Sequence, residues 1–173
     1  MNDELYPVNK LKWQSIILLA LALVVDTQNP VSAEEKIMLG RIEEAILLPQ
    51  RVKLPARIDT GAAICSLDVR DLKISGNMAQ FKLPEPYGGL ELRLPIVRWG
   101  HVRSTNTREK RPVVQLEIRL GPRLLHVEAN LTDRSQFKYP LLIGRNALKK
   151  GFVVDVSKWN IAPPDDRQKV QAP

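Results

Sequence analysis

The chain is poor in the side chains that hold metals and form disulfides. It has one cysteine, Cys65, and two histidines, His101 and His126, in 173 residues. A single cysteine excludes an internal disulfide, and these side chains are not spaced as zinc ligands usually are. The sequence has neither a His-Glu-x-x-His pair nor a Gly-x-x-x-x-Gly-Lys-Ser/Thr phosphate-binding loop. We therefore expect no metal and no nucleotide cofactor, and we interpret Cys65 as a small buried side chain.

Aromatic residues are also scarce, at 5% of the chain, and glycine (9) is less frequent than proline (13). The core must therefore consist mainly of Leu, Ile and Val side chains. Hydrophobic residues make up 44% and charged residues 26%, which is typical of a globular domain. Frequent prolines suit short strands joined by turns better than long helices. The length favours one domain with its own core over two large ones.

The first 33 residues have the pattern of an export signal. Two lysines precede an apolar run, Ser15 to Val25, which has the length of a signal-peptide core and is short for a membrane-spanning helix. Small residues ending at Ala33 then form a site for signal peptidase. We therefore predict a signal peptide at 1–33 and an exported, periplasmic domain at 34–158. The alternative is an uncleaved signal anchor that tethers the domain to the inner membrane.

Short segments that alternate apolar and polar residues fill this domain. Strands are predicted over residues 37–48, 50–58, 64–69, 72–74, 79–83, 90–102, 113–120, 124–131 and 152–156. Gly40 is expected to mark a bulge in the first strand, and Asn146 to Lys150 is the one good short helix. Many short strands with one late helix indicate an all-β closed barrel. The tail at 159–173 contains a Pro-Pro-Asp-Asp run and is predicted to be disordered.

Two motifs, separated by about the length of a domain, carry the functional information. An apolar strand leads into Asp59-Thr60-Gly61-Ala62, and Leu141-Leu142-Ile143-Gly144-Arg145-Asn146-Ala147-Leu148 follows. An Asp-Thr-Gly triplet alone is often only a turn, whereas the pair of motifs is much more specific. Together they resemble the retropepsins, the single-domain aspartic proteases best known from retroviruses. The resemblance is strongest for a bacterial retropepsin-like aspartic protease family often labelled ATP-dependent zinc protease, and it runs from about Met38 to Ser157.

The resemblance implies an aspartic endopeptidase whose catalytic residue is Asp59. Two carboxyl groups held about 3 Å apart do not both ionise, so one accepts a proton from water while the other polarises the scissile carbonyl. One chain supplies one such loop, so the chemistry requires a homodimer with Asp59 from each copy at the two-fold axis. Asp155 is the nearest second candidate, but no Thr-Gly follows it.

The resemblance also assigns supporting roles around this aspartate. The residues that shape the active-site loop are Thr60, Gly61 and Ala62. The residues that open the late helix beneath the loop, and brace the loop and the dimer contact, are Gly144, Arg145 and Asn146. Viral members often carry a second aspartate directly after the Asp-Thr-Gly-Ala run, and it pairs with the arginine. Here that position is Ala63, so Asp133 is the candidate partner of Arg145.

The retropepsin fold also needs a flap, a hairpin that closes over the substrate and excludes water. The polar stretch from Ser104 to Lys110 lies between two alternating segments and is the best candidate, although it lacks the several glycines of viral flaps. The candidate flap or substrate-contact residues are Trp99, Ser104 and Arg111. The alternatives are an ordinary solvated hairpin tip and a tryptophan that only packs.

The leading hypothesis is an exported, homodimeric aspartic endopeptidase that hydrolyses an envelope protein or peptide. Two alternatives remain open: a non-catalytic retropepsin-like domain that binds a peptide or partner, and a protease that needs a partner protein for activation. The formal net charge of +7 suits acidic substrates or an anionic surface. The basic residues are scattered without interleaved aromatics, which argues against nucleic-acid binding.

Overall fold

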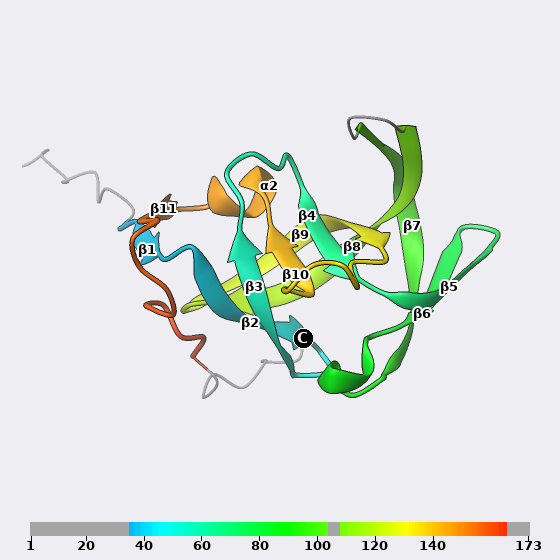
Figure 1. Ribbon diagram of the computed structural model, residues 1–173, viewed down its shortest axis with the longest axis horizontal. Coiled ribbons are helices and arrows are strands. Elements are labelled where there is room, and N and C mark those ends of the chain that lie inside the picture. The colour runs from blue at the N-terminus through cyan, green and yellow to red at the C-terminus, as the bar shows by residue number, and fades with distance from the viewer. Residues whose placement is uncertain (1–34, 104–107, 166–173) are drawn as a thin grey trace, which may run out of the picture. The chain divides into compact units, whose positions relative to one another are not determined.

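The computed structural model describes residues 35–103 and 108–165 (Figure 1). The strands, in chain order, are β1 (Ile37–Leu39), β2 (Ile42–Leu48), β3 (Val52–Ile58), β4 (Cys65–Asp68), β5 (Arg70–Ser75), β6 (Met78–Lys82), β7 (Glu91–Arg103), β8 (Arg108–Leu120), β9 (Arg123–Thr132), β10 (Leu141–Ile143) and β11 (Phe152–Val154). Within these residues a 3-10 turn, η1 (Glu85–Tyr87), follows β6, and one α-helix, α2 (Arg145–Leu148), follows β10.

Six of the strands close into a barrel. Their hydrogen-bonded order is β2-β3-β10-β4-β9-β8, and the antiparallel pairing of β2 with β8, with Ala45 opposite Leu120, joins the two ends. The strands β7, β6 and β5 continue outward from β8. The prediction of an all-β closed barrel with one short late helix is confirmed.

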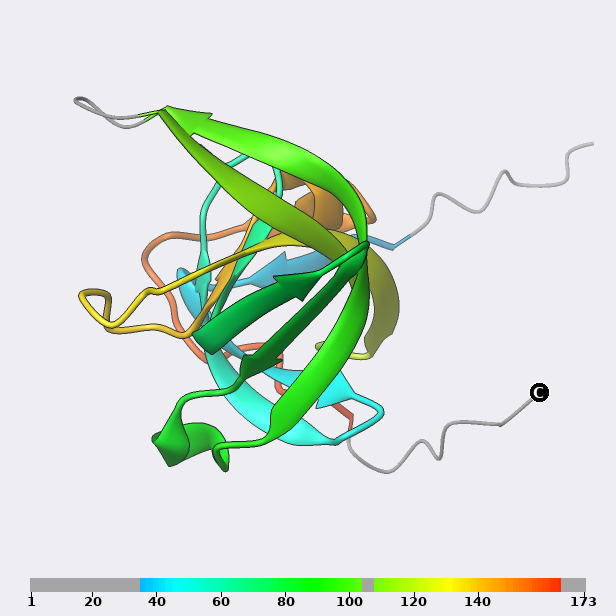
Figure 2. The same ribbon diagram turned by 90° about the vertical axis from the view of Figure 1, so that its right-hand side faces the viewer.

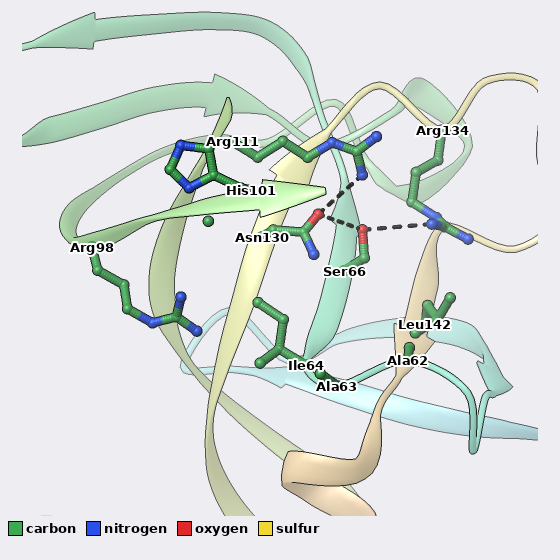
Figure 3. A pocket seen from close by; sticks show the side chains of 11 residues that line it. Ala62, Ala63, Ile64, Ser66, Arg98, His101, Arg111, Asn130, Arg134 and Leu142 are labelled. Carbon is green, nitrogen blue, oxygen red and sulfur yellow. Dashed lines mark hydrogen bonds between the residues drawn. The ribbon is translucent and has the colours of Figure 1, made fainter. Parts of the chain in front are cut away.

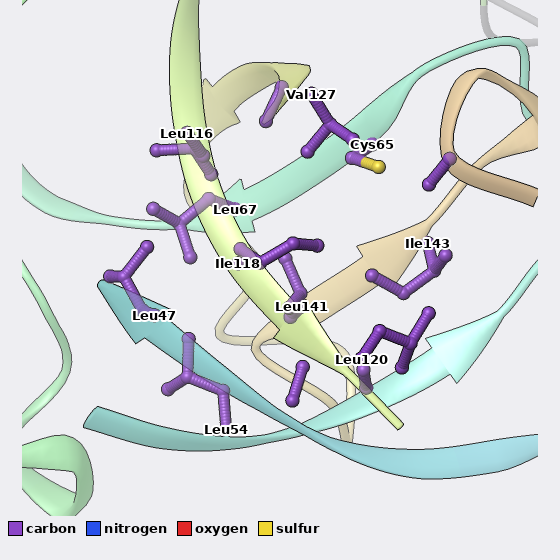
Figure 4. Packing of buried hydrophobic residues seen from close by; sticks show 14 of the residues in the cluster. Leu47, Leu54, Cys65, Leu67, Leu116, Ile118, Leu120, Val127, Leu141 and Ile143 are labelled. Atoms are coloured by element: carbon purple, nitrogen blue, oxygen red, sulfur yellow. The ribbon is translucent and has the colours of Figure 1, made fainter. Parts of the chain in front are cut away.

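Aliphatic side chains fill the barrel, as the scarcity of aromatic residues predicts. Figure 4 shows leucine, isoleucine and valine side chains from β2, β3, β4, β8, β9 and β10 meeting in one cluster. In β9 the alternation places Leu125, Val127 and Ala129 inside, while Leu124 and His126 are exposed. Each fully buried Leu, Ile or Val side chain contributes about 1.5–3 kcal/mol relative to an exposed one.

Residues 37–48, expected as one strand with a bulge, form two strands in different sheets. β1 pairs in parallel with β11, with Ile37 opposite Phe152, whereas β2 enters the barrel. Gly40 lies at the break, where a Cβ atom would come within 2.5 Å of the carbonyl oxygen of Lys158. The bulge prediction is therefore wrong, because this glycine permits two backbone segments to cross at close range.

Residues 159–165 belong to the tail that the composition predicts to be disordered, yet they pack against the barrel. The buried carboxylate of Glu43 accepts backbone hydrogen bonds from Ile161 at 3.3 Å and Ala162 at 3.1 Å. It accepts another from Gly40 at 2.5 Å. A buried carboxylate needs such donors, so Glu43 and the start of the tail stabilise each other.

The strand order β3-β10-β4 determines where the two sequence motifs meet. β3 ends at Ile58 and β4 begins at Cys65, so residues 59–64 cross the end of β10, where α2 begins. β3 and β10 run in parallel with Ile58 opposite Ile143. The long hairpin of β7 and β8 projects from the barrel (Figure 2). The Asp-Thr-Gly loop and the Gly-Arg-Asn segment therefore lie side by side.

Candidate active site

Asp59 directly follows β3, and its carboxylate organises the loop that it begins. One oxygen, Oδ1, accepts hydrogen bonds from the backbone N–H groups of Gly61 at 2.8 Å and Ala62 at 3.2 Å. The backbone N–H of Asp59 donates to the carbonyl of Ile143 at 3.0 Å. These bonds fix both ends of the side chain, and they leave Oδ2 with no protein donor among the described residues. The half-buried carboxylate therefore has one oxygen available for other partners.

The start of α2 supports the loop from below. A Cβ atom at Gly144 would lie 2.5 Å from the carbonyl carbon and oxygen of Ile64, so only glycine permits this contact. The next two backbone N–H groups donate to the loop: Arg145 to the carbonyl of Ala62 at 2.9 Å, and Asn146 to that of Ala63 at 3.1 Å. The loop and the helix start thus form one hydrogen-bonded unit.

The guanidinium of Arg145 adds a second brace. Its Nη1 donates to the carbonyl oxygens of Thr60 at 3.0 Å and Gly61 at 2.6 Å. The expectation that Asp133 pairs with Arg145 is wrong, because Asp133 instead contacts Arg70 at 3.1 Å. Because Ala63 stands where viral members often have an aspartate, the guanidinium of Arg145 donates to backbone carbonyls of the loop instead. Hydrogen bonds that the Asp133 carboxylate accepts from Ser135 lower the pKa of Asp133 below its usual value.

Asn146 links the loop to the barrel wall. Its Oδ1 accepts from the backbone N–H of Cys65 at 3.1 Å, and its Nδ2 donates to the carbonyl of Glu128 at 2.8 Å. The Cys65 thiol also donates to Oδ1 at 3.3 Å. Burial raises the pKa of this thiol from 9.0 to about 11. Cys65 is therefore a protonated, buried side chain, consistent with the interpretation from the sequence.

A cleft of about 450 Å³ lies beside the loop. Ala62, Ala63 and Ile64 form its floor, and the β7–β8 hairpin contributes Gly100 and Arg111. The other residues that line it are Ser66, Arg98, His101, Asn130, Arg134 and Leu142. A cleft of this volume accommodates a few residues of an extended peptide.

The three candidate flap or substrate-contact residues differ in whether they line the cleft. Arg111 lines the cleft. Trp99 does not, since its 40%-exposed ring stacks with the Lys110 ammonium, 4.7 Å from the ring centroid. On a strand, successive side chains point to opposite sides, so Trp99 lies on the face opposite Arg98 and Gly100, which line the cleft. Ser104 lies outside the described residues, as does most of the predicted flap tip.

The walls of the cleft are strongly basic, which the sequence pattern did not predict. Arg98 (β7), Arg111 (β8) and Arg134, in the loop after β9, all contribute guanidinium groups. Arg98 contacts Glu128 at 2.6 Å, and Arg111 contacts Glu109 at 2.6 Å. Figure 3 shows Arg111 and Arg134 near the polar pair Ser66 and Asn130, with Arg98 on the opposite side. These residues are far apart in the sequence, and no motif connects them.

Within residues 35–103 and 108–165, no three His, Cys, Asp or Glu side chains gather in a way that would hold a metal ion. No helix in the same residues is long and apolar enough to cross a membrane. The apolar run expected to be a signal, Ser15 to Val25, lies outside the described part of the chain.

Known proteins share this architecture. The family described as "RimB-like: Retropepsin-like aspartic endopeptidase RimB" matches residues 86–165. The crystal structure of protein Lpg0085 from Legionella pneumophila, with unknown function (DUF785), is 33% identical, with a TM-score of 0.63. The match covers 72% of this chain and 97% of that protein. The chain belongs to the retropepsin-like family. The resemblance suggested by the two motifs is thus confirmed.

Curated relatives of this retropepsin-like chain are much longer. A "Probable alpha-L-glutamate ligase" of Shewanella pealeana is 31% identical over 114 residues, which are 61% of this chain and 25% of the relative. The protein of the same name from Shewanella halifaxensis is 30% identical over 114 residues. The retropepsin-like chain therefore spans about a quarter of the length of these relatives.

Proposed function

We propose that this retropepsin-like chain is an aspartic endopeptidase that works as a homodimer. The observation that carries the proposal is the Asp59 loop, whose carboxylate is held at one oxygen by its own backbone while Arg145 braces the loop. Thr60 and Gly61 are exposed, so a second copy has access to the loop. The other sequence candidate, Asp155, bonds to Ser157 at the end of β11 and offers no such loop.

The proposed chemistry uses one Asp59 from each copy. The ionised carboxylate accepts a proton from water, whose oxygen attacks the peptide carbonyl carbon. The protonated carboxyl of the other copy donates its proton to the carbonyl oxygen. When the resulting tetrahedral diol collapses, the C–N bond breaks and the carboxyl that took the proton from water donates it to the amine nitrogen. The other carboxylate accepts a proton from a diol hydroxyl, so the pair again shares one proton.

An acidic peptide is the substrate class that the cleft favours. Three arginines line it, and guanidinium groups bind carboxylates with charge-assisted hydrogen bonds. The names of the curated relatives refer to glutamate, an acidic building block. We therefore propose that the enzyme cleaves next to glutamate or aspartate side chains.

A partner-dependent enzyme is the second candidate. The related segment occupies only 25% of proteins named as glutamate ligases, which suggests that this type of domain acts beside another catalytic unit. In that case the isolated chain binds acidic peptides but cleaves them only when the partner is added. A domain that binds peptides and never cleaves them is the remaining outcome.

The decisive test compares the domain from Glu34 with its Asp59→Asn variant on an unstructured acidic protein, at about pH 4 to 7 where carboxyl dyads share a proton. We expect cleavage by the wild type and none by the variant. Asp155→Asn is the matched control and should cleave normally. Sedimentation of the same samples reports whether active protein is dimeric, and activity in a chelator tests the expectation of no metal. Equal cleavage by both proteins would disprove the proposal.

We also propose that the domain is exported, either released by cleavage after Ala33 or tethered by the preceding run. The proposal rests on the sequence of residues 1–33 alone. Cell fractionation, with mass measurement of the N-terminus of the recovered protein, distinguishes the cleaved form, the tethered form and a protein that stays in the cytoplasm.

A further inference from the structure

Arg134 differs from the other two arginines of the cleft because it is buried. It is only 8% exposed, although it lines the cleft. Its backbone N–H donates to Oδ1 of Asp68 at 2.5 Å, which anchors the residue at the end of β9. Its guanidinium stacks on Phe137, 4.6 Å from the ring centroid. The side chain is thus held in place at the cleft wall.

The hydrogen bonds of this guanidinium are long. Nη1 lies 3.5 Å from Oγ of Ser66, and Nε lies 3.5 Å from the carbonyl oxygen of Tyr139. Strong hydrogen bonds from a guanidinium to oxygen are about 2.7–2.9 Å. Both protein contacts are therefore weak, and several N–H donors remain for a ligand.

No carboxylate forms a salt bridge with Arg134 among residues 35–103 and 108–165. Arg98 and Arg111, in contrast, each contact a glutamate at 2.6 Å. The nearby carboxylate of Asp68 is bound by the guanidinium of Arg70 at 2.5 and 3.0 Å. Of the three cleft arginines, Arg134 is thus the one that has no salt-bridge partner among the described residues.

A buried charge of this kind is costly until a partner of opposite charge arrives. Burial lowers the pKa of Arg134 below that of an exposed arginine; the nearby carboxylates of Asp68 and Asp59 only partly offset this, and the Arg111 charge acts in the same direction as burial. A carboxylate from a ligand would remove this penalty. Arg111 lines the same cleft, and its positive charge adds to the attraction. Its Nη1 donates to Oδ1 of Asn130 at 3.4 Å, and the same Oδ1 accepts from Ser66 at 3.0 Å. Figure 3 shows this chain of contacts from Arg111 to Arg134.

We infer that Arg134 is the specificity-determining residue of the cleft, and that its guanidinium binds the side-chain carboxylate of one substrate residue near the scissile bond. The inference rests on the proposed function and extends it, because it assigns recognition to one of three arginines. Arg111 is the second donor, and the Ser66–Asn130 pair positions the two guanidinium groups.

Binding is measured separately from cleavage, in the Asp59→Asn background. The probes are two labelled peptides of equal length, one with glutamate and one with glutamine at every acidic position. We expect the parent to bind the glutamate peptide more tightly, and Arg134→Gln to lose this preference by about tenfold or more. Arg57→Gln removes one exposed positive charge on β3, outside the cleft, and should keep the preference. Arg98→Gln should have an intermediate effect, since that arginine already forms a salt bridge with Glu128.

Two further variants keep the test decisive if Arg134→Gln unfolds. Arg134→Lys keeps the charge and should retain part of the preference, and Phe137→Ala removes the exposed ring that orients the guanidinium. In the cleaving enzyme, both should raise KM for the glutamate peptide with little change in kcat. An unchanged glutamate preference in folded Arg134→Gln would overturn the inference.

Failure of the proposed function has a different signature. If the wild type cleaves neither peptide, but the Asp59→Asn protein still prefers glutamate and loses that preference with Arg134→Gln, the chain is a binding domain and Arg134 keeps its role. If the wild type cleaves and Arg134→Gln does not change its glutamate preference, the proposed protease function is kept and the inferred role of Arg134 is rejected.

Discussion

The Asp59 loop and the cleft beside it are built in opposite ways. The loop is held mainly through backbone groups: its carbonyls accept from α2 and from Arg145, and its own N–H groups donate to Asp59. The cleft walls are made of long charged side chains that come from β7, β8 and the loop after β9. Backbone bracing keeps a reacting group rigid, whereas side chains change recognition without disturbing the fold. Substitutions in the two regions should therefore have different effects.

The largest effect is expected where the loop meets α2. Gly144→Ala places a Cβ atom 2.5 Å from the backbone of Ile64, which cannot move without displacing the loop. We expect a loss of about 2–4 kcal/mol in the free energy of unfolding, measured by urea denaturation.

Gly76→Ala is the matched control for this substitution. It meets nothing within 4 Å but imposes an alanine at a φ of +59°. Its cost should be about 1 kcal/mol. If the two variants are equally stable, close backbone contact is not what holds the loop.

Arg145→Met should leave the barrel folded and reduce activity. It removes the hydrogen bonds to the carbonyls of Thr60 and Gly61, so the loop and Asp59 are less well positioned. A small misplacement of a reacting group lowers kcat about tenfold to a hundredfold. The measurement is kcat with an acidic peptide, and Arg145→Lys should fall between the two. Full activity in Arg145→Met would mean that α2 alone supports the loop.

A substitution in the cleft should have a smaller effect, and it should strengthen peptide binding. Glu128→Gln frees the guanidinium of Arg98, which contacts Glu128 at 2.6 Å. Because exposed ion pairs are weak, we expect acidic peptides to bind about twofold to fivefold more tightly. Peptide titration of the Asp59→Asn, Glu128→Gln double variant measures this. Weaker binding would show that the pair orders the cleft and does not compete with the ligand.

The last expected effect involves no substitution and concerns the reactivity of Cys65, which contacts Asn146 at the start of α2. Burial raises its pKa from 9.0 to about 11, so the thiolate fraction near pH 8 is about a hundredfold lower than in an unfolded chain. Iodoacetamide should therefore modify the folded protein far more slowly than the urea-unfolded protein. The difference should shrink as the pH rises toward 11, provided that the protein stays folded. Fast modification of folded protein at pH 8 would indicate that the loop opens.

Much of the fold follows from local patterns. Alternation of apolar residues predicted β8 and β9, and the predicted strands at 72–74 and 79–83 correspond to the hairpin of β5 and β6. The division of residues 37–48 was missed because it depends on β11 and Lys158, more than 100 positions later in the chain. The packing of the first part of the tail was missed for the same reason, because Glu43 provides its partner.

The sequence by itself determined the family and the chemical group at its centre. Short motifs identify the residues of the loop because each of them contacts the backbone immediately around it or one fixed neighbouring segment. These residues are Asp59, Gly61, Gly144 and Arg145. Only the tertiary structure decided that Arg145 binds carbonyls and not Asp133, and that Arg111 and Arg134 share one cleft. Charged side chains are long and their partners are set by strand pairing, so a linear pattern does not predict which of them meet.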